Sequence, residues 1–166
     1  MKKICISLLL LPAIYAGAEE AKTPEAFVGV IKQIYDETYS EEGYVTLEEK
    51  YLEPKFASLF TKLQGFEYGD MECIGYNYII QGQDYDEKSR EITRSLKIKV
   101  LDKESIEARF KNFGKEASLI YKINCQGGKC LITDFIEKNP ENNKPVSFRQ
   151  SLQECIGDLE KNQPAK

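Results

Sequence analysis

The chain has 166 residues, with 23 basic and 27 acidic side chains and a formal net charge of −4. This acidity argues against nucleic acid and anionic membrane surfaces as partners, because both select basic proteins. It is compatible with a basic protein partner, although mild acidity is also an ordinary means of solubility. The chain contains no histidine, which excludes Ser-His-Asp and Cys-His catalytic sites and imidazole acid–base chemistry.

The first 18 residues have the pattern of a secretory signal peptide. Lys2 and Lys3 form a basic start, residues 4–15 are apolar, and residues 16–18 are the small residues of a cleavage site. The apolar run is short for a bilayer span, which disfavours the alternative of a membrane anchor. We expect cleavage after Ala18 and a periplasmic or secreted product without membrane insertion. Its 148 residues suit one domain, at 19–160, with a polar tail at 161–166.

Four cysteines remain after the predicted cleavage: Cys73, Cys125, Cys130 and Cys155. An even count in an exported chain predicts two disulfides. Cys125 and Cys130 flank a glycine-containing turn between two strand-like runs, so a hairpin would place them opposite each other. Cys73 is then left to pair with Cys155. Zinc is the alternative, but the spacing lacks paired C-x-x-C units and histidine is absent. We expect no metal and no cofactor.

Two helices are predicted at the start of the exported chain. The first opens at residues 23–25, where threonine can cap, proline suits the first position and glutamate favours the positive helix end. Its predicted end lies at 41–43. The second opens at Thr46 with a capping box to Glu49, and Pro54 would break or restart it. Apolar residues recur at helical spacing in both: Phe27, Ile31, Ile34 and Tyr35, then Phe56, Leu59, Phe60 and Leu63.

Residues 65–91 are predicted to be an irregular or partly extended connection that is rich in aromatic and polar side chains. Such a long segment inside a compact domain is either a functional loop or a sign that an element within it has not been recognised. The apolar period then changes to two. This predicts a four-stranded antiparallel meander with one dry face, at 92–101, 105–110, 117–125 and 130–136. A closing helix follows, with a Ser147–Gln150 capping box and an apolar stripe that includes Cys155 or Ile156.

These elements predict an α+β fold in which N-terminal helices pack on a curved four-stranded sheet, with a C-terminal helix. The chain resembles an uncharacterised family of exported bacterial proteins with this architecture, the nuclear-transport-factor-2-like cone of the cystatin-like superfamily. The resemblance implies a fold and an export route but no activity. The chain departs from it at Gly82, where alanine is frequent, and at Cys130, where an aromatic is common. The similar stretches are PEAFVGVIKQIYD at 24–36, YLEPKFASLF at 51–60, GQDYD at 82–86, KNFG at 111–114, LITDFI at 131–136 and SFRQSLQ at 147–153.

Gln83 and Asp84 are the first candidate site residues, because they follow the apolar pair Ile79-Ile80. One interpretation places both side chains at a pocket mouth, where they bind a ligand or a basic group of a partner. The other is structural: an Asp or amide side chain satisfies backbone N–H groups where a buried run enters a turn. The structural interpretation predicts that Asp84→Ala lowers thermal stability.

Asp134 is the second candidate, because alternation places it on the same face of its strand as Ile132 and Ile136. An inward carboxylate could act as a base, with a tyrosine polarising the substrate. Alternatively, Asp134 bonds loop backbone, or the alternation breaks and it faces water.

The tyrosines form the third group, with ten in a chain that has no tryptophan. Exposed tyrosines are good interface residues, whereas buried ones are packing. Both interpretations stay open for Tyr68, Tyr76, Tyr78 and Tyr85, and the last three are our candidates for partner contact.

We therefore expect an exported, non-enzymatic binding module whose partner is a protein or a cell-envelope ligand. A role as an inhibitor of, or an immunity protein against, a secreted hydrolase fits export and disulfides. The alternatives are a small cone-fold enzyme that uses Asp134 or Asp84 as a base together with a tyrosine, and a purely structural envelope protein.

Overall fold

The computed structural model describes residues 21–37, 50–86, 88–138 and 144–162. The predicted signal peptide, the first helix's predicted end at 41–43 and the Thr46–Glu49 capping box lie outside these residues. Within them the elements are α1 (Pro24–Glu37), α2 (Pro54–Leu63), α3 (Gly69–Cys73), α4 (Glu91–Ser95), β1 (Lys97–Asp102), β2 (Ser105–Asn112), β3 (Lys115–Gln126), β4 (Lys129–Lys138), β5 (Pro145–Ser147) and α5 (Phe148–Asn162).

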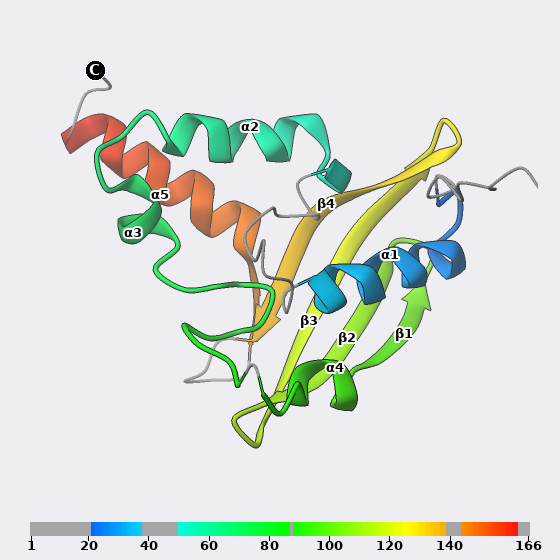
Figure 1. The fold of residues 1–166 in the computed structure, drawn as a ribbon. Helices are drawn as coiled ribbons and strands as arrows, with labels where there is room; N and C mark the ends of the chain where they lie inside the picture. The colour runs from blue at the N-terminus through cyan, green and yellow to red at the C-terminus, as the bar shows by residue number, and fades with distance from the viewer. Residues whose placement is uncertain (1–20, 38–49, 87, 139–143, 163–166) are drawn as a thin grey trace, which may run out of the picture.

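The strands form one antiparallel sheet in the order β1-β2-β3-β4-β5, and the sheet is open (Figure 1). The α+β class, the antiparallel sheet and the closing helix are thus confirmed. The predicted strand count of four is wrong, because β5 adds a fifth strand beside β4. Its three residues are too short for a period of two to be recognised.

The prediction of a strand from residue 92 is also wrong, because residues 91–95 form α4. The hydroxyl of Ser95 donates back to the carbonyls of Glu91 and Ile92 within this short helix and accepts a bond from the N–H of Lys111 in β2. The apolar alternation begins only at Leu96, in front of β1.

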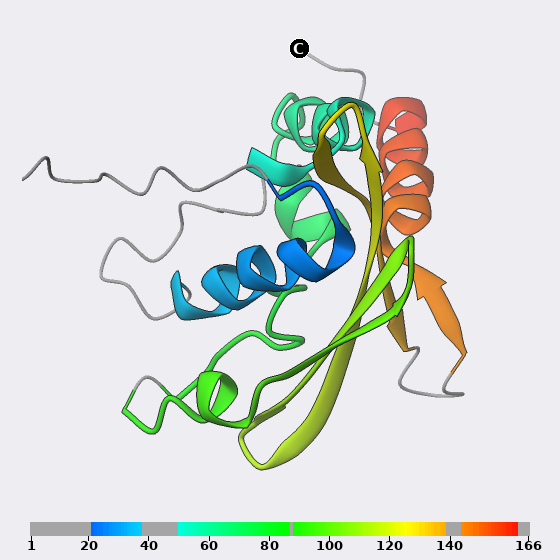
Figure 2. The same cartoon turned by 90° about the vertical axis from the view of Figure 1, so that its right-hand side faces the viewer.

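Helix α1 covers β1 and β2 on one face of the sheet (Figure 2). The predicted cap at its start is confirmed, since the hydroxyl of Thr23 accepts a bond of 3.2 Å from the N–H of Ala26. Its apolar stripe is buried against the sheet, and the ring of Tyr35 lies 5.2 Å from that of Phe110. Side chains therefore fill the space between α1 and the sheet.

Helices α2, α3 and α5 pack together beside β4. An aromatic cluster connects α2, α5 and β4, and in it the ring of Tyr78 lies 4.5 Å from Phe148 and 5.2 Å from Phe135. The predicted cap of α5 is confirmed, because the N–H of Gln150 donates to the Ser147 hydroxyl at 3.0 Å.

Both predicted disulfides are present. Cys73–Cys155 joins α3 to α5 across 82 positions of sequence, and Cys125–Cys130 closes the β3–β4 hairpin. Two disulfides are consistent with an oxidising extracellular compartment. Among the described residues, every helix is too short or too polar to cross a bilayer.

Candidate functional site

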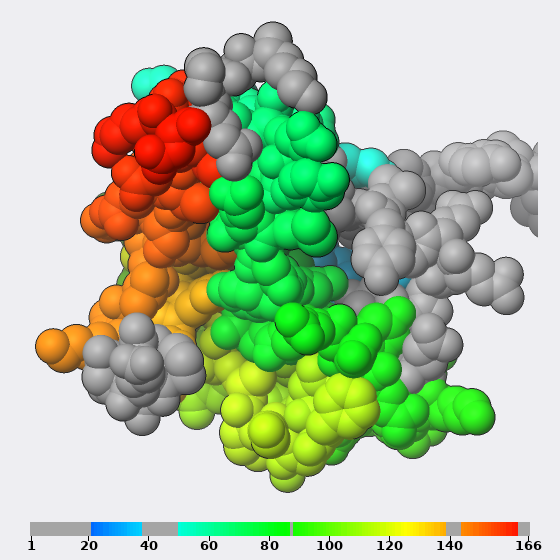
Figure 3. Space-filling view, turned by 90° about the vertical axis from the view of Figure 1, so that its left-hand side faces the viewer, coloured from blue at the N-terminus to red at the C-terminus, as the bar shows by residue number. Residues whose placement is uncertain are grey.

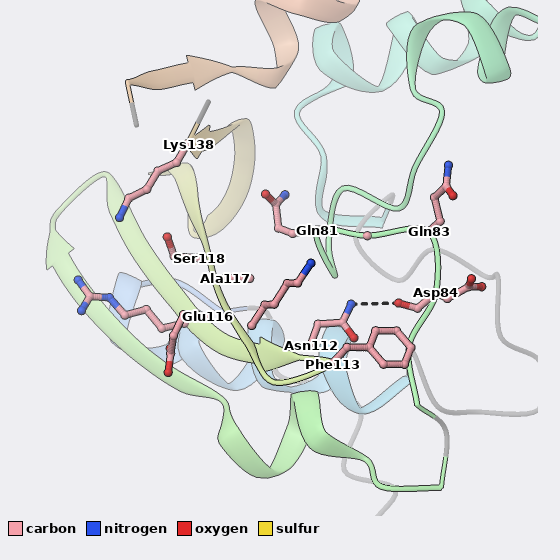
Figure 4. A pocket seen from close by; sticks show the side chains of 12 residues that line it. Gln81, Gln83, Asp84, Asn112, Phe113, Glu116, Ala117, Ser118 and Lys138 are labelled. Atoms are coloured by element: carbon pink, nitrogen blue, oxygen red, sulfur yellow. Dashed lines mark hydrogen bonds between the residues drawn. The ribbon is translucent and has the colours of Figure 1, made fainter. Parts of the chain in front are cut away.

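A cavity of about 730 Å³ lies between the loop at 81–84, the β2–β3 hairpin and the end of β4 (Figure 4). We call it the mouth cavity. Its volume is within the range of small-molecule and peptide sites. In the space-filling view the hairpin and the segment that precedes α4 lie against each other at one end of the molecule (Figure 3). The lining residues are Gln81, Gly82, Gln83, Asp84, Arg109, Asn112, Phe113, Lys115, Glu116, Ala117, Ser118 and Lys138.

The apolar pair Ile79-Ile80 anchors the loop on the core side, and both side chains are buried. The side-chain oxygen of Asn77 accepts bonds from their N–H groups at 3.0 and 3.3 Å. The chain then turns sharply at Gln81, where φ is +53°. This turn changes the direction of the chain, so that the residues after the buried pair reach the cavity and the surface.

Asn112 at the end of β2 holds the loop against the hairpin. Its side chain donates to the carbonyl of Asp84 at 3.0 Å and to the carbonyl of Ile80 at 3.3 Å. Asn112 is only 9% exposed, so these bonds are shielded from water and worth more than surface ones. A Cβ added at Gly82 would lie 3.0 Å from the same amide nitrogen, which explains why the loop carries glycine there.

Phe113 projects from the tip of the hairpin. The turn consists of Phe113 and Gly114, with φ values of +49° and +73°, between the paired residues Asn112 and Lys115. A two-residue turn with both φ values positive favours Asn or Gly at its first position. The Phe113 side chain is nevertheless 60% exposed. An exposed aromatic in a left-handed conformation is a candidate functional residue, because such strain concentrates at functional sites.

Electric charge in the mouth cavity is unevenly compensated. The cations are Arg109, Lys115 and Lys138, and the anions are Asp84 and Glu116. The Nε of Arg109 lies 2.9 Å from a carboxylate oxygen of Glu107, outside the lining. A carboxylate oxygen of Glu116 lies 3.4 Å from the Nζ of Lys111, which is also outside the lining of the cavity. Neither lining lysine makes an ion pair with another described residue, so the cavity is a locally positive region of an acidic chain.

Asp134 lies away from the mouth cavity, and its predicted orientation is wrong. Lys122 pairs with Asp134 whereas Ile123 pairs with Ile132, so Thr133 is an extra residue in β4. This bulge moves Asp134 to the face opposite Ile132, because one inserted residue reverses the alternation.

The carboxylate of Asp134 instead caps α5. It accepts bonds from the hydroxyl of Ser147 at 2.5 Å and from the N–H of Arg149 at 2.9 Å. A carboxylate at a helix N-terminus is stabilising. The structural interpretation of Asp134 therefore accounts for both of its oxygens.

The predicted backbone-capping role of Asp84 belongs to Asp86. One oxygen of Asp86 accepts bonds from the N–H groups of Lys88 and Ser89 at 3.0 and 3.1 Å, and the bond from Ser89 is the main cause of a lowered pKa of Asp86. The exposed Asp84 contributes its backbone carbonyl to the loop. Its carboxylate makes no hydrogen bond to any residue in the described ranges and points outward, away from Asn112 and the centre of the lining (Figure 4). Gln83 also lines the mouth cavity, and its side-chain amide donates a long hydrogen bond of 3.4 Å to the carbonyl of Gly75.

The three candidate tyrosines are dispersed. Tyr78 is buried in the aromatic cluster, and Tyr85 is half-buried against the core. Tyr76 is 38% exposed, and its hydroxyl donates to Glu137 at 2.5 Å. Gln81 donates to the other oxygen of Glu137 at 3.1 Å. Burial is the main cause that raises the pKa of both Tyr76 and Glu137.

Sequence reasoning missed Phe113, Asn112 and the cations of the cavity. The β2–β3 hairpin could be predicted, since the gap between the two alternating runs fits a short turn. The presence of phenylalanine at a turn position that favours Asn or Gly was the available signal.

The chain matches no protein-family model, no curated protein and no solved structure. Among the described residues, histidine, cysteine and carboxylate side chains form no group of three that could hold a metal ion. The assignment of the site therefore rests on its geometry and chemistry.

Proposed function

We propose that the protein is an exported, non-enzymatic binding module, periplasmic or secreted, whose mouth cavity engages a partner protein. The nuclear-transport-factor-2-like cone is the fold that we propose with it, supported by α1 on one face of a curved antiparallel sheet and by the closing helix α5. Inhibition of a secreted hydrolase, or immunity to it, is the biological role that fits export and disulfides.

The observation that carries the proposal is Phe113. Its ring is exposed beside the cavity, although burying such a ring would stabilise the fold. Its backbone is held in a conformation that costs about 1 kcal/mol or more. Both the exposed ring and the left-handed backbone are unfavourable for the free protein. Their presence is explained if a partner buries the ring, since aromatic residues are preferred anchors at interfaces.

Two observations favour binding over the enzymatic alternative. Asp134, the proposed base, is bonded to the N-terminus of α5 through both oxygens. The hydroxyl of Tyr76, the exposed candidate tyrosine, donates to Glu137. Neither Asp134 nor Tyr76 lines the mouth cavity. An acid and a base that converge on one reacting atom are required for such an enzyme.

The proposal is tested by site-specific photo-cross-linking. Phe113 is replaced by p-benzoylphenylalanine in the full chain, and the protein is irradiated in an envelope extract of the producing organism. We expect one adduct of discrete mass, because the ring would be buried against a single partner. Unlabelled wild-type protein should compete for the adduct, and unlabelled Phe113→Ala should not.

The matched control carries the same cross-linker at Leu101, an exposed apolar residue of β1. Leu101 should give no competed adduct. Identical adducts at both positions, or no adduct at Phe113, would refute the binding site at the mouth cavity.

A further inference from the structure

Cations form a row across the outer face of the sheet, next to the mouth cavity. Lys97 of β1 pairs with Arg109 of β2, and Arg109 pairs with Ser118 of β3. Ile120 of β3 pairs with Ile136 of β4, and extending this register by two residues brings Lys138 beside Ser118; both line the cavity (Figure 4). Direct cross-strand partners point to the same face. With neighbouring strands about 4.8 Å apart, the row extends over roughly 14 Å.

Arg109 is pre-oriented in this row. Its Nε lies 2.9 Å from Glu107, whose side chain is only 8% exposed, while the Arg109 side chain is 63% exposed. A guanidinium has five donors in a fixed plane, so one contact with Glu107 fixes its position and leaves donors that face solvent. A held guanidinium binds a carboxylate with less loss of conformational entropy than a mobile one.

The positive charge of the row is largely uncompensated. Lys97 and Lys138 make no ion pair with any residue that the structure describes, and both are exposed. Of the neighbouring carboxylates, Glu107 contacts Arg109 and Glu116 contacts Lys111, and Asp84 is the lining anion that forms no ion pair with a described residue. The hydroxyl of Ser118 adds a neutral donor in the middle of the row.

We propose that this row binds an acidic segment of the partner protein, with carboxylates at Arg109 and Lys138. This inference rests on the proposed function and names the chemistry of its partner. The residues beside the row favour a peptide over an inorganic polyanion. Phe113 offers an apolar contact for a side chain. Gln81 and Gln83 use their amide N–H groups on Tyr78, Glu137 and Gly75, and their side-chain oxygens can accept from a peptide N–H.

The test uses a fluorescein-labelled hexaglutamate peptide and the full chain, with fluorescence anisotropy at low ionic strength. We expect binding that weakens as salt is added, because exposed charges are screened. Arg109→Gln and Lys138→Gln should each weaken binding about tenfold, the usual loss for one charge-assisted hydrogen bond. Arg109→Lys, which keeps the charge and loses the planar fork, should fall between wild type and Arg109→Gln.

The charge-matched control is Lys55→Gln in α2, an exposed lysine at the other end of the molecule (Figure 1). It should leave the affinity unchanged. Equal weakening by Lys55→Gln, or absence of binding at low salt, would overturn the inference. So would inorganic tripolyphosphate that competes more strongly per molecule than unlabelled hexaglutamate. If Arg109→Gln fails to fold, Lys138→Gln and Lys97→Gln provide the same test.

The two proposals fail separately. Cross-linking through Phe113 reports the partner whatever its charge, whereas the peptide reports the row. If a competed adduct forms equally well when the cross-linking protein also carries Arg109→Gln or Lys138→Gln, the binding site at the mouth cavity is supported. The proposal that the partner presents an acidic segment is then refuted.

Discussion

Phe113 is the residue at which local strain and the proposed function coincide. Its φ of +49° suits Asn better than an aromatic residue, so Phe113→Asn should raise the free energy of unfolding by roughly 1 kcal/mol. Unlabelled Phe113→Asn protein should also fail to compete for the adduct, because it lacks the ring that the partner would bury. Urea unfolding and competition of the cross-link measure the two effects.

Tyr68 provides the matched control for this prediction. It is also an exposed aromatic residue, with a φ of +63°, and it lies outside the mouth cavity. Tyr68→Asn should increase stability by a similar amount and still compete fully for the adduct. Lower stability of Phe113→Asn would show that the ring stabilises the free protein, which removes the main support for the site.

At the scale of elements, the predictable features were those with a strong local pattern. The stripe of α1, the cap of α5 and the alternation in β2 and β3 are each set by neighbouring residues. The bulge at Thr133 was not visible, because nothing in LITDFI separates a regular strand from one with an extra residue. Residues 91–95 adjoin the alternating pattern that starts at Leu96 and were therefore predicted as strand. Their packing against β2 favours the helix α4.

The candidate site was predictable only where it lies in one stretch of sequence. Gln83 and Asp84 follow a buried pair, and that order places them at the surface. Arg109, Phe113 and Lys138 join them from three other positions in the chain. Their proximity depends on sheet register and on the amide of Asn112, which no local pattern encodes.

The contact of Glu137 with Tyr76 and Gln81 ties the loop to β4 and should make stability depend on pH. Burial raises the pKa of Glu137 above its ordinary 4.5, and the charge of Asp134 raises it further, against the two hydrogen bonds that lower it. The native state therefore holds this proton more tightly than the unfolded state. The stability that it contributes is fully present below pH 4.5 and is lost as the pH rises through the native pKa.

Glu137→Gln should remove this loss, because a neutral amide resembles the protonated acid. The unfolding free energy of the variant relative to wild type should rise between pH 4.5 and 7, as followed by urea unfolding at several pH values. Glu154→Gln, at an exposed carboxylate of α5, controls for the removal of one charge. Parallel pH profiles for wild type and Glu137→Gln would contradict the prediction.

At the scale of the whole molecule, the two disulfides constrain the unfolded chain to different extents. Cys73–Cys155 joins residues 82 positions apart, whereas Cys125–Cys130 joins residues only 5 apart. The entropy that a cross-link removes from the unfolded state grows with the logarithm of the loop length. The long-range bridge also holds α3 against α5, so its removal affects the packing between two elements.

We expect the double change Cys73→Ser, Cys155→Ser to lower the free energy of unfolding by about 4 kcal/mol, and Cys125→Ser, Cys130→Ser by about 2 kcal/mol. Guanidinium unfolding under non-reducing conditions measures both. Because each variant loses two cysteines and keeps one bridge, each is the control for the other. Equal losses, or a larger loss for the hairpin bridge, would show that native-state packing and not chain entropy dominates. Neither Cys73 nor Cys155 lines the mouth cavity, and hexaglutamate binding should survive in the variant that lacks them.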